Sequence, residues 1–167
     1  MTKVRDFVSG YRLARLIRAG HSSMIWEAVK EATGERFALK MLKMEMARDR
    51  EELGYLKHEV EVAKDLNHPN LVRVYELDTK TPAPFLVLEL CAGFNLKQVL
   101  REGPDPIAHL TDKIINQAAH GLHYLNEKGW VHCDVKPDNF LVNDQGDVKL
   151  IDFGLAQKAK RGLRKLL

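Results

Sequence analysis

Apolar and polar residues alternate along the first half of the chain in the way that is typical of β-strands. Five runs either alternate or concentrate apolar residues over the length of a strand: residues 11–18, 23–30, 35–42, 71–77 and 85–90. Ala32-Thr33-Gly34 is a turn between the second and third runs, and the turn before the last run contains proline. We therefore expect β-strands in this half, the first three of them antiparallel.

One amphipathic helix interrupts these strands. Between Asp49 and Leu66 the apolar residues recur at helical spacing: Leu53, Leu56, Val60 and Ala63. Glu59 lies beside this stripe, on the face that would meet the sheet. Asn67-His68-Pro69-Asn70 ends the helix, because proline cannot continue it.

Beyond Gly93 the pattern becomes helical. Residues 96–101 predict a short helix, and Pro104-Asp105-Pro106 opens a longer one that ends at Gly129. The longer helix carries an apolar stripe: Leu110, Ile114, Ala118, Leu122 and Leu125. A mostly β first half and a helical second half meet near residues 91–94, so the expected fold class is α+β.

A hairpin near the end of the chain brings two oxygen-bearing side chains together. Residues 140–142 and 148–151 predict short strands, joined by the turn at residues 143–147. A hairpin of this length returns Asn139 to the side of Asp152. An amide beside a carboxylate suits a hard divalent ion such as magnesium, so we expect both residues to be metal ligands.

Two motifs carry the chemistry of this chain. His132-Cys133-Asp134-Val135-Lys136-Pro137-Asp138-Asn139 places an acid, a lysine and an amide within six residues, and leaves Asp134 to accept a proton. Ile151-Asp152-Phe153-Gly154 follows the second strand of the hairpin. Together they resemble the signature of the protein kinase family, in which an H-R-D-x-x-x-x-N loop precedes D-F-G. Lys136 is similar to the serine/threonine branch, and Cys133 replaces the usual arginine.

The resemblance covers about residues 11–156 and implies a protein-kinase-like α+β fold. We expect an antiparallel small lobe with one helix over residues 1–90 and the hinge with the beginning of a helical large lobe over residues 91–156. A basic tail over residues 157–167 would follow. The implied activity is transfer of the γ-phosphoryl group of ATP to a serine or threonine of a protein substrate, with Mg²⁺ as cofactor.

The resemblance also implies roles for individual residues. Asp134 and Lys136 would be catalytic, the first accepting the proton of the substrate hydroxyl and the second stabilising γ-phosphoryl oxygens. Asn139 and Asp152 would hold magnesium. The implied nucleotide-binding residues are Ile17, Gly20, Ile25, Ala38, Lys40, Glu59, Glu89, Cys91, Asn139 and Leu141. Each apolar residue of this set could equally be part of a core.

Lys40 closes the segment Phe37-Ala38-Leu39-Lys40, which resembles the V-A-I-K segment of the family. Glu59 precedes Pro69 by ten residues, which matches the family's spacing between its helix glutamate and the H-P-N turn. We expect an ion pair between Lys40 and Glu59 that directs the ammonium to the α- and β-phosphates.

Departures from the family pattern indicate weaker or altered function. Only Gly20 remains of the three glycines of the phosphate loop, so we expect weakened ATP affinity. The Cys133 thiol cannot bind a phosphate as arginine does, so phosphorylation should not switch this protein through residue 133. His132 is expected to pack against Phe153, and two other histidines at helical spacing are expected to be surface residues: His120 and His123.

No A-P-E segment follows the second motif. We therefore expect a fragment, a naturally short product or a chain completed by a partner, with impaired activity when alone. The stripe between Leu110 and Leu125 would then be an exposed apolar face, covered by a partner or by a missing C-terminal segment. The alternative function is a catalytically inactive nucleotide-binding pseudokinase or a scaffold module.

Composition and charge indicate which kinds of partner to expect. Of 167 residues, 45% are hydrophobic and 29% are charged, as in ordinary globular proteins, and the net charge is +3. Five cations crowd the last ten positions and leave the remainder slightly acidic: Lys158, Lys160, Arg161, Arg164 and Lys165. We read this tail as a solvated terminus, with no nucleic-acid or membrane partner expected, although a basic tail can also contact acidic partners.

Two cysteines without a disulfide framework fit a reducing cytoplasm, which is the expected location. Residues 1–10 lack the apolar core of a signal peptide, and the longest apolar run, at residues 85–88, is too short to cross a bilayer.

Overall fold

The computed structural model describes residues 7–103 and 105–159, which form two compact units. The first unit contains Val74–Leu90 and the described residues up to Val60; the second contains Glu61–Arg73 and the described residues from Cys91 onward. Residues 61–73 belong to the second unit because the Val72 N–H donates to the Leu150 carbonyl at 3.0 Å. The boundary expected at residue 90 would instead place residues 61–73 with the first unit.

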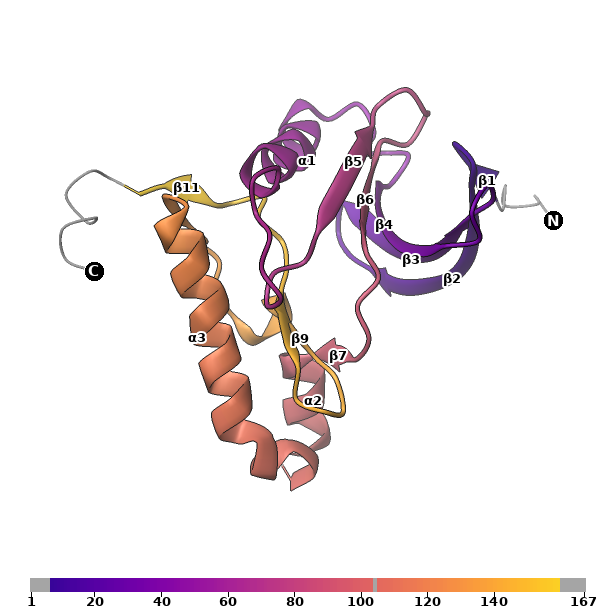
Figure 1. Cartoon of the computed structure of the whole chain (residues 1–167). Helices are drawn as coiled ribbons and strands as arrows, with labels where there is room; N and C mark the ends of the chain where they lie inside the picture. Colours follow the sequence, from indigo (N-terminus) through magenta and orange to yellow (C-terminus); the bar gives the residue numbers. More distant parts are fainter. Residues whose placement is uncertain (1–6, 104, 160–167) are drawn as a thin grey trace. The chain divides into compact units, whose positions relative to one another are not determined.

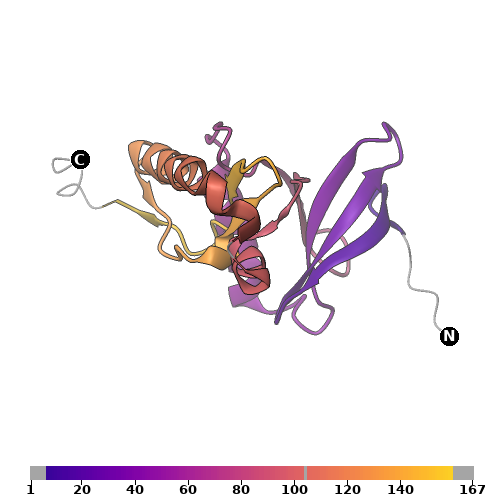
Figure 2. The same cartoon turned by 90° about the horizontal axis from the view of Figure 1, so that it is seen from below.

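The first unit is built on one antiparallel sheet, drawn in indigo to magenta in Figure 1, with its strands also visible side by side in Figure 2. Its six strands have the order β1-β2-β3-β4-β6-β5. They are β1 (Phe7–Val8), β2 (Tyr11–Ala19), β3 (Ser23–Lys30), β4 (Arg36–Leu42), β5 (Val74–Asp78) and β6 (Phe85–Glu89). The predicted strands are confirmed, except that the strand expected from residue 71 begins at Val74, because residues 70–72 pair in the second unit.

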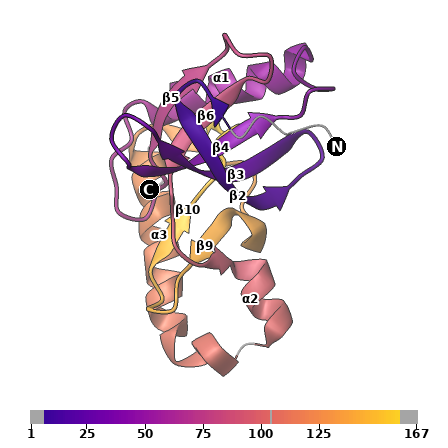
Figure 3. The ribbon, with the colours of Figure 1, turned by 90° about the vertical axis from the view of Figure 1, so that its right-hand side faces the viewer.

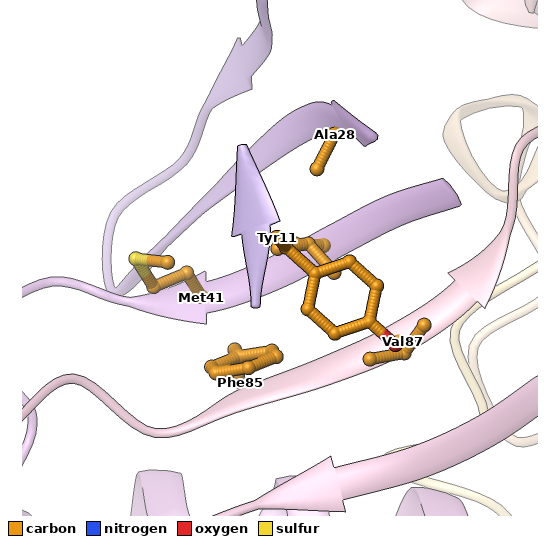
Figure 4. Packing of buried hydrophobic residues seen from close by; sticks show 6 residues of the cluster. Tyr11, Ala28, Met41, Phe85 and Val87 are labelled. Carbon is orange, nitrogen blue, oxygen red and sulfur yellow. The ribbon is translucent and has the colours of Figure 1, made fainter. Parts of the chain in front are cut away.

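The core of this sheet fixes the position of β4. Figure 4 shows the buried cluster, which consists of Tyr11, Ala28, Leu39, Met41, Phe85 and Val87. Successive side chains of a strand point to opposite faces, so burial of Leu39 and Met41 on this face places Lys40 on the other. Tyr11 also donates a hydrogen bond to Glu76 at 2.9 Å, and burial, followed by this carboxylate, raises the pKa of its phenol.

The predicted amphipathic helix is α1 (Arg50–Ala63). Asp49 caps it, since its Oδ1 accepts the N–H groups of Glu51 at 2.8 Å and Glu52 at 3.1 Å. Leu56 and Glu59 on its inner face are each 1% exposed. The cap and the apolar stripe together account for where this helix starts and which face it buries.

The second unit combines two α-helices, two 3₁₀-helices and short strands. They are β7 (Phe94–Asn95), α2 (Leu96–Glu102), η1 (Asp105–Leu110), α3 (Thr111–Glu127), β8 (Trp130–Val131), η2 (Pro137–Asn139), β9 (Phe140–Val142), β10 (Val148–Leu150) and β11 (Gln157–Lys158). The strands pair as β10-β9-β7 and as β11-β8. The predicted hairpin is therefore confirmed as β9 and β10, and the predicted short helix as α2.

The start of the longer helix differs from the prediction. The 3₁₀-helix η1 occupies residues 105–110, and the regular helix α3 begins only at Thr111, whose hydroxyl donates to the Ala108 carbonyl at 2.8 Å. Pro106 lies within η1, and a proline near the beginning of a helix is compatible with either a 3₁₀-helix or an α-helix, so the sequence pattern alone does not distinguish them. Pro104 itself lies outside the described residues.

The apolar stripe of α3 is buried at two of its positions and half-buried at the others, so it is not the exposed face that was expected. Ile114 is 5% exposed and Leu125 is fully buried, because α3 packs against β10 and β8 within its own unit. Figure 3 shows α3 beside β10. The large apolar side chain that α3 does expose is that of Ile115, which lies outside the stripe. His120 and His123 are exposed, as predicted.

Only the beginning of the predicted basic tail is described. Gln157 and Lys158 pair with Val131 and Trp130, and the Lys158 ammonium lies 3.8 Å from the centroid of the Trp130 ring. The other tail cations lie outside the described residues: Lys160, Arg161, Arg164 and Lys165. Residues 1–6 also lie outside them. No helix in the described part of the chain is both long enough and apolar enough to cross a membrane.

A carboxylate shared by three strands makes the stability of the first unit depend on pH. Glu27 on β3 is 4% exposed and accepts hydrogen bonds from Arg36 on β4 and from Arg15 on β2. The Arg36 guanidinium, followed by that of Arg15, lowers the pKa of the Glu27 carboxyl. A lowered carboxyl pKa stabilises the fold above the unfolded pKa, and this stabilisation is lost as the pH falls through the folded pKa.

We expect Glu27→Gln to lower the free energy of unfolding by about 1 kcal/mol at pH 7. The difference from the wild type should shrink below about pH 4.3, the ordinary glutamate pKa. Urea unfolding at several pH values measures both effects. A difference that is independent of pH would show that the charge of Glu27 is not its source.

Candidate functional site

The first unit contains one buried ion pair among the predicted site residues. Lys40 Nζ on β4 lies 2.8 Å from Glu59 Oε2 on α1, so the ion pair predicted from the sequence is present. The side chain of Lys40 is 17% exposed and that of Glu59 is 1% exposed. Because Glu59 is buried and its partner is partly accessible, the pair holds one ammonium in a fixed place with some access from outside.

Residues near Lys40 in the sheet include two of the predicted nucleotide contacts. Ile25 on β3 is the register partner of Lys40, and Ala38 on β4 is the register partner of Glu27 and Leu88. Ile25 is half-buried, and Ala38 is buried. Their placement on β3 and β4 is compatible with either a nucleotide contact or plain packing.

The predicted phosphate loop is a tight turn between β2 and β3. The Gly20 N–H donates to the Ser23 carbonyl at 2.8 Å. A Cβ atom at residue 20 would lie 3.2 Å from that same oxygen, so a larger residue would crowd the turn. Ile17, at the exposed end of β2, is 43% exposed. The turn is closed by its own backbone, which limits how freely it can rearrange.

The second unit holds residues 132–139, which we call the catalytic loop after the family motif that they resemble. Asn139 Nδ2 donates to the Asp134 carbonyl at 2.8 Å and to Asp134 Oδ2 at 2.9 Å. Lys136 Nζ lies 2.7 Å from the same Oδ2. The Asp134 carboxylate raises the pKa of the Lys136 ammonium, with smaller contributions from Asp138 and Asp152. The loop thus gathers an ammonium and an amide around one carboxylate, that of Asp134.

His132 supports this loop from inside. It is 2% exposed, and its ring lies 5.9 Å from that of Phe153 in an edge-to-face contact, which confirms the predicted packing. Its Nε2 lies 3.1 Å from the Ile151 carbonyl, and its Nδ1 accepts the Asp134 N–H at 3.3 Å. These contacts fit a neutral imidazole that donates from Nε2. His132 therefore links the two motifs as a packing residue.

Two non-glycine residues of these motifs have left-handed backbones. Cys133 has φ of 62° and Asp152 has φ of 67°. Such backbones are uncommon outside glycine and persist where the surroundings hold them. The Cys133 side chain is exposed, and its thiol donates to the Val131 carbonyl at 3.4 Å. One of these residues, Cys133, directly precedes Asp134, and the other is Asp152 itself.

The hairpin places Asn139 and Asp152 next to each other, as the sequence predicts. The Ile151 N–H donates to the Asn139 carbonyl at 2.9 Å, which fixes the residue before Asp152 against Asn139. The amide nitrogen of Asn139 is committed to Asp134, so its amide oxygen points the other way. One amide oxygen and one carboxylate are hard ligands that fit magnesium.

No three histidine, cysteine, aspartate or glutamate side chains cluster as a metal site in the described part of the chain. A magnesium ion at Asn139 and Asp152 would therefore complete its coordination with phosphate oxygens and water, as is usual for this ion.

The remaining predicted contacts are distributed over both units. Glu89 ends β6 in the first unit and is half-buried. Cys91 and Leu141 belong to the second unit; Leu141 on β9 is the register partner of Lys149 and Asn95. The Lys40–Glu59 pair and the catalytic loop are each well defined within their own unit.

Sequence reasoning missed several residues that hold the catalytic loop and the hairpin. Lys97 on α2 lies 3.1 Å from Asp138 Oδ2 in the catalytic loop. Asn70 and Gln117 contact each other and the start of β10. The H-P-N turn is a visible signal at Asn70, but in the sequence it indicates only a helix end and the spacing of the family. Nothing in the pattern around Lys97 or Gln117 indicates these contacts.

Comparison with known proteins identifies relatives of this chain. Residues 11–165 match the family described as the protein kinase domain. The chain is 37% identical to serine/threonine-protein kinase PknA of Mycobacterium tuberculosis over 153 residues, which are 88% of this chain and 35% of PknA. It is 35% identical to PknL of the same organism, over 89% of this chain and 37% of PknL. A probable serine/threonine-protein kinase, PknA2 of Bifidobacterium longum, is 31% identical over 90% of this chain and 20% of its own length.

These relatives are longer than this chain. The chain spans about a third of the length of PknA and PknL, and less of PknA2.

Proposed function

Because the chain belongs to the protein kinase domain family, we propose that it acts as a magnesium-dependent serine/threonine protein kinase. The single observation that carries this proposal is the cluster of Asp134, Lys136 and Asn139, in which a carboxylate, an ammonium and an amide meet within 2.9 Å. Relatives named as serine/threonine kinases support the choice of hydroxyl acceptor. ATP would be the phosphoryl donor.

The mechanism follows from the charges of these side chains. Asp134 orients the serine or threonine hydroxyl of the protein substrate and accepts its proton as the oxygen bonds to the γ-phosphorus. The bond to the leaving ADP oxygen breaks, and Lys136 stabilises the charge on the γ-phosphoryl oxygens. Magnesium, held by Asn139 and Asp152, would neutralise phosphate charge.

Binding of the nucleotide would use residues of both units. Lys40, held by Glu59, contacts the α- and β-phosphates in this proposal. Ile25, Ala38 and Leu141 would contact the adenine, and the backbone of Glu89 and Cys91 would bond its edge. The remaining contacts, Ile17 and Gly20, belong to the phosphate loop. Its closed turn supports weakened ATP affinity.

The second candidate is a catalytically inactive nucleotide-binding or scaffold module. Exposed apolar residues of the second unit favour a docking role: Phe94 is 62% exposed and Ile115 is 61% exposed. A protein partner or a C-terminal segment would cover them. A cytoplasmic location remains part of the proposal, and both cysteines occur as thiols in the described residues.

The proposal is tested by thermal unfolding with ATP, with and without magnesium, followed by radiolabel transfer to a generic basic protein. We expect magnesium-dependent stabilisation by ATP, with slow or absent transfer by the chain alone. Any transfer should fall by about 10²- to 10⁴-fold in Asp134→Asn, while stabilisation by ATP persists, because a general base acts on the reaction more than on binding.

Cys133→Ser is a matched control beside Asp134, because its side chain is exposed and has no role in the proposed chemistry. Transfer that survives Asp134→Asn would remove this residue from the mechanism. Failure of ATP to stabilise the wild type under any magnesium concentration would favour the scaffold.

A further inference from the structure

We infer that Gln117 on α3 is a positioning residue that holds Asp152 in place through β10. This inference deepens the proposed function, since Asp152 is the proposed magnesium ligand. It concerns a residue that the motifs do not include. The contacts that carry it all lie within the second unit.

Both edges of β10 are occupied close to Asp152. On one edge β10 pairs with β9, and the Ile151 N–H continues this pairing by donating to the Asn139 carbonyl at 2.9 Å. On the other edge the Leu150 N–H donates to the Asn70 carbonyl at 2.8 Å. Asp152 therefore follows directly after a segment that is hydrogen-bonded on both edges.

Side chains complete the second edge at Val148, where none of the described strands pairs with β10. Gln117 Oε1 accepts the Val148 N–H at 2.9 Å and the Asn70 amide at 2.7 Å. Asn70 Nδ2 also donates to the Val148 carbonyl at 2.9 Å. The two side chains thus satisfy both backbone groups of Val148 in place of a neighbouring strand, and Gln117 is the acceptor that joins them.

Packing leaves little room for an alternative arrangement. Asn70 is 8% exposed, and Gly121 lies one helical turn beyond Gln117 on α3. A Cβ atom at residue 121 would lie 3.1 Å from the Asn70 carbonyl, so α3 and residue 70 are in close contact. Buried amides that lose their partners are costly, which makes this connection rigid.

Lys113 reinforces the same end of the strand. Its Nζ lies 2.7 Å from Asp147 Oδ1 and 2.7 Å from the Gln145 carbonyl. Lys113 and Gln117 are separated by four residues and so lie on the same face of α3. One helix face therefore holds both the turn before β10 and its first residue.

This anchoring bears on Asp152 because its backbone is strained. Asp152 has φ of 67°, a conformation that must be maintained by its surroundings. If the start of β10 loosens, Ile151 and Asp152 can relax, and the distance between the Asp152 carboxylate and Asn139 is no longer fixed. Loss of a residue that orients a metal ligand typically weakens metal affinity by roughly 10- to 100-fold.

The test compares three single variants of the whole chain. Gln117→Met keeps the length of the side chain and removes the acceptor. Gln117→Glu keeps acceptor oxygens, with Lys113 at hand to balance the added charge near Asp147. Asn116→Leu changes the adjacent, exposed position of α3 and serves as the matched control.

Two measurements are made on each variant. Amide hydrogen exchange without nucleotide should be at least about tenfold faster at residues 148–152 in Gln117→Met than in the wild type, with exchange in the first unit unchanged. The magnesium concentration that half-saturates stabilisation by ATP should rise roughly tenfold, while ATP binding in the absence of magnesium is unaltered. Gln117→Glu should restore most of both properties.

Unchanged exchange at residues 148–152 in Gln117→Met would overturn the inference, and so would a loss that Asn116→Leu reproduces. An equal loss of ATP binding with and without magnesium would also overturn it, since that indicates general destabilisation. A wild type that shows no magnesium-dependent binding would instead refute the proposed function, and the exchange measurement would still decide whether Gln117 holds residues 148–152.

Discussion

Lys40→Met is expected to lower the free energy of unfolding by about 3 kcal/mol, the lower end for removing one partner of a buried ion pair. The reason is that Glu59, 1% exposed, would lose the ammonium that lies 2.8 Å away. The same substitution should weaken ATP affinity at least about tenfold, because a fixed cation at the phosphates is removed. Urea unfolding and titration with ATP measure the two effects separately.

A double variant separates the structural role of Lys40 from its proposed function. In Lys40→Met/Glu59→Leu the pair is replaced by apolar side chains, which is often neutral for stability. We expect the double variant to regain most of the lost stability without regaining ATP affinity. If it is as unstable as Lys40→Met alone, the loss of the ammonium beside Glu59 is not the cause. If it binds ATP as tightly as the wild type, Lys40 is not a phosphate contact.

Asp152→Asn is expected to abolish the effect of magnesium on ATP binding. The substitution removes the one carboxylate of the proposed ligand pair and keeps the size of the side chain. At an ATP concentration of about 100 times Kd, the nucleotide should raise the free energy of unfolding of the wild type by about 2.7 kcal/mol. In Asp152→Asn, ATP with magnesium should raise the free energy of unfolding only as much as ATP without magnesium raises that of the wild type.

Asp138→Asn is the matched control for this experiment. It makes the same change of charge, but Asp138 pairs with Lys97 at 3.1 Å and has no role as a magnesium ligand in the proposal. We expect its magnesium dependence to equal that of the wild type. If both variants lose the magnesium effect, net charge near the catalytic loop is responsible and Asp152 is not a specific ligand.

Local chemistry made much of this protein predictable. Alternation predicted the strands that carry Lys40 and Ile25, and a helical stripe predicted the helix that carries Glu59. The hairpin that joins Asn139 to Asp152 followed from a short turn between two short apolar runs. These features depend on residues close together in the chain, where period and turn chemistry act directly.

The same reasoning was wrong about the apolar face of α3. The stripe from Leu110 to Leu125 is amphipathic in the sequence whether or not something covers it, and periodicity cannot name the partner. In the structure β10 and β8 cover Ile114 and Leu125. The late start of α3 was also missed, because a proline-rich beginning permits either a 3₁₀-helix or an α-helix.

By itself, the sequence determined which residues are chemically able to serve a phosphoryl-transfer site and on which elements they lie. Only the tertiary structure decided what holds them. Asn70 is hydrogen-bonded to Gln117, which is 47 residues away in the sequence, and to the Val148 carbonyl, which is 78 residues away. Hydrogen bonds over such separations have no period and no composition in the sequence. They exist because, within residues 7–103 and 105–159, no strand pairs with the second edge of β10 at Val148. The buried backbone groups of Val148 must therefore be satisfied by polar side chains within reach.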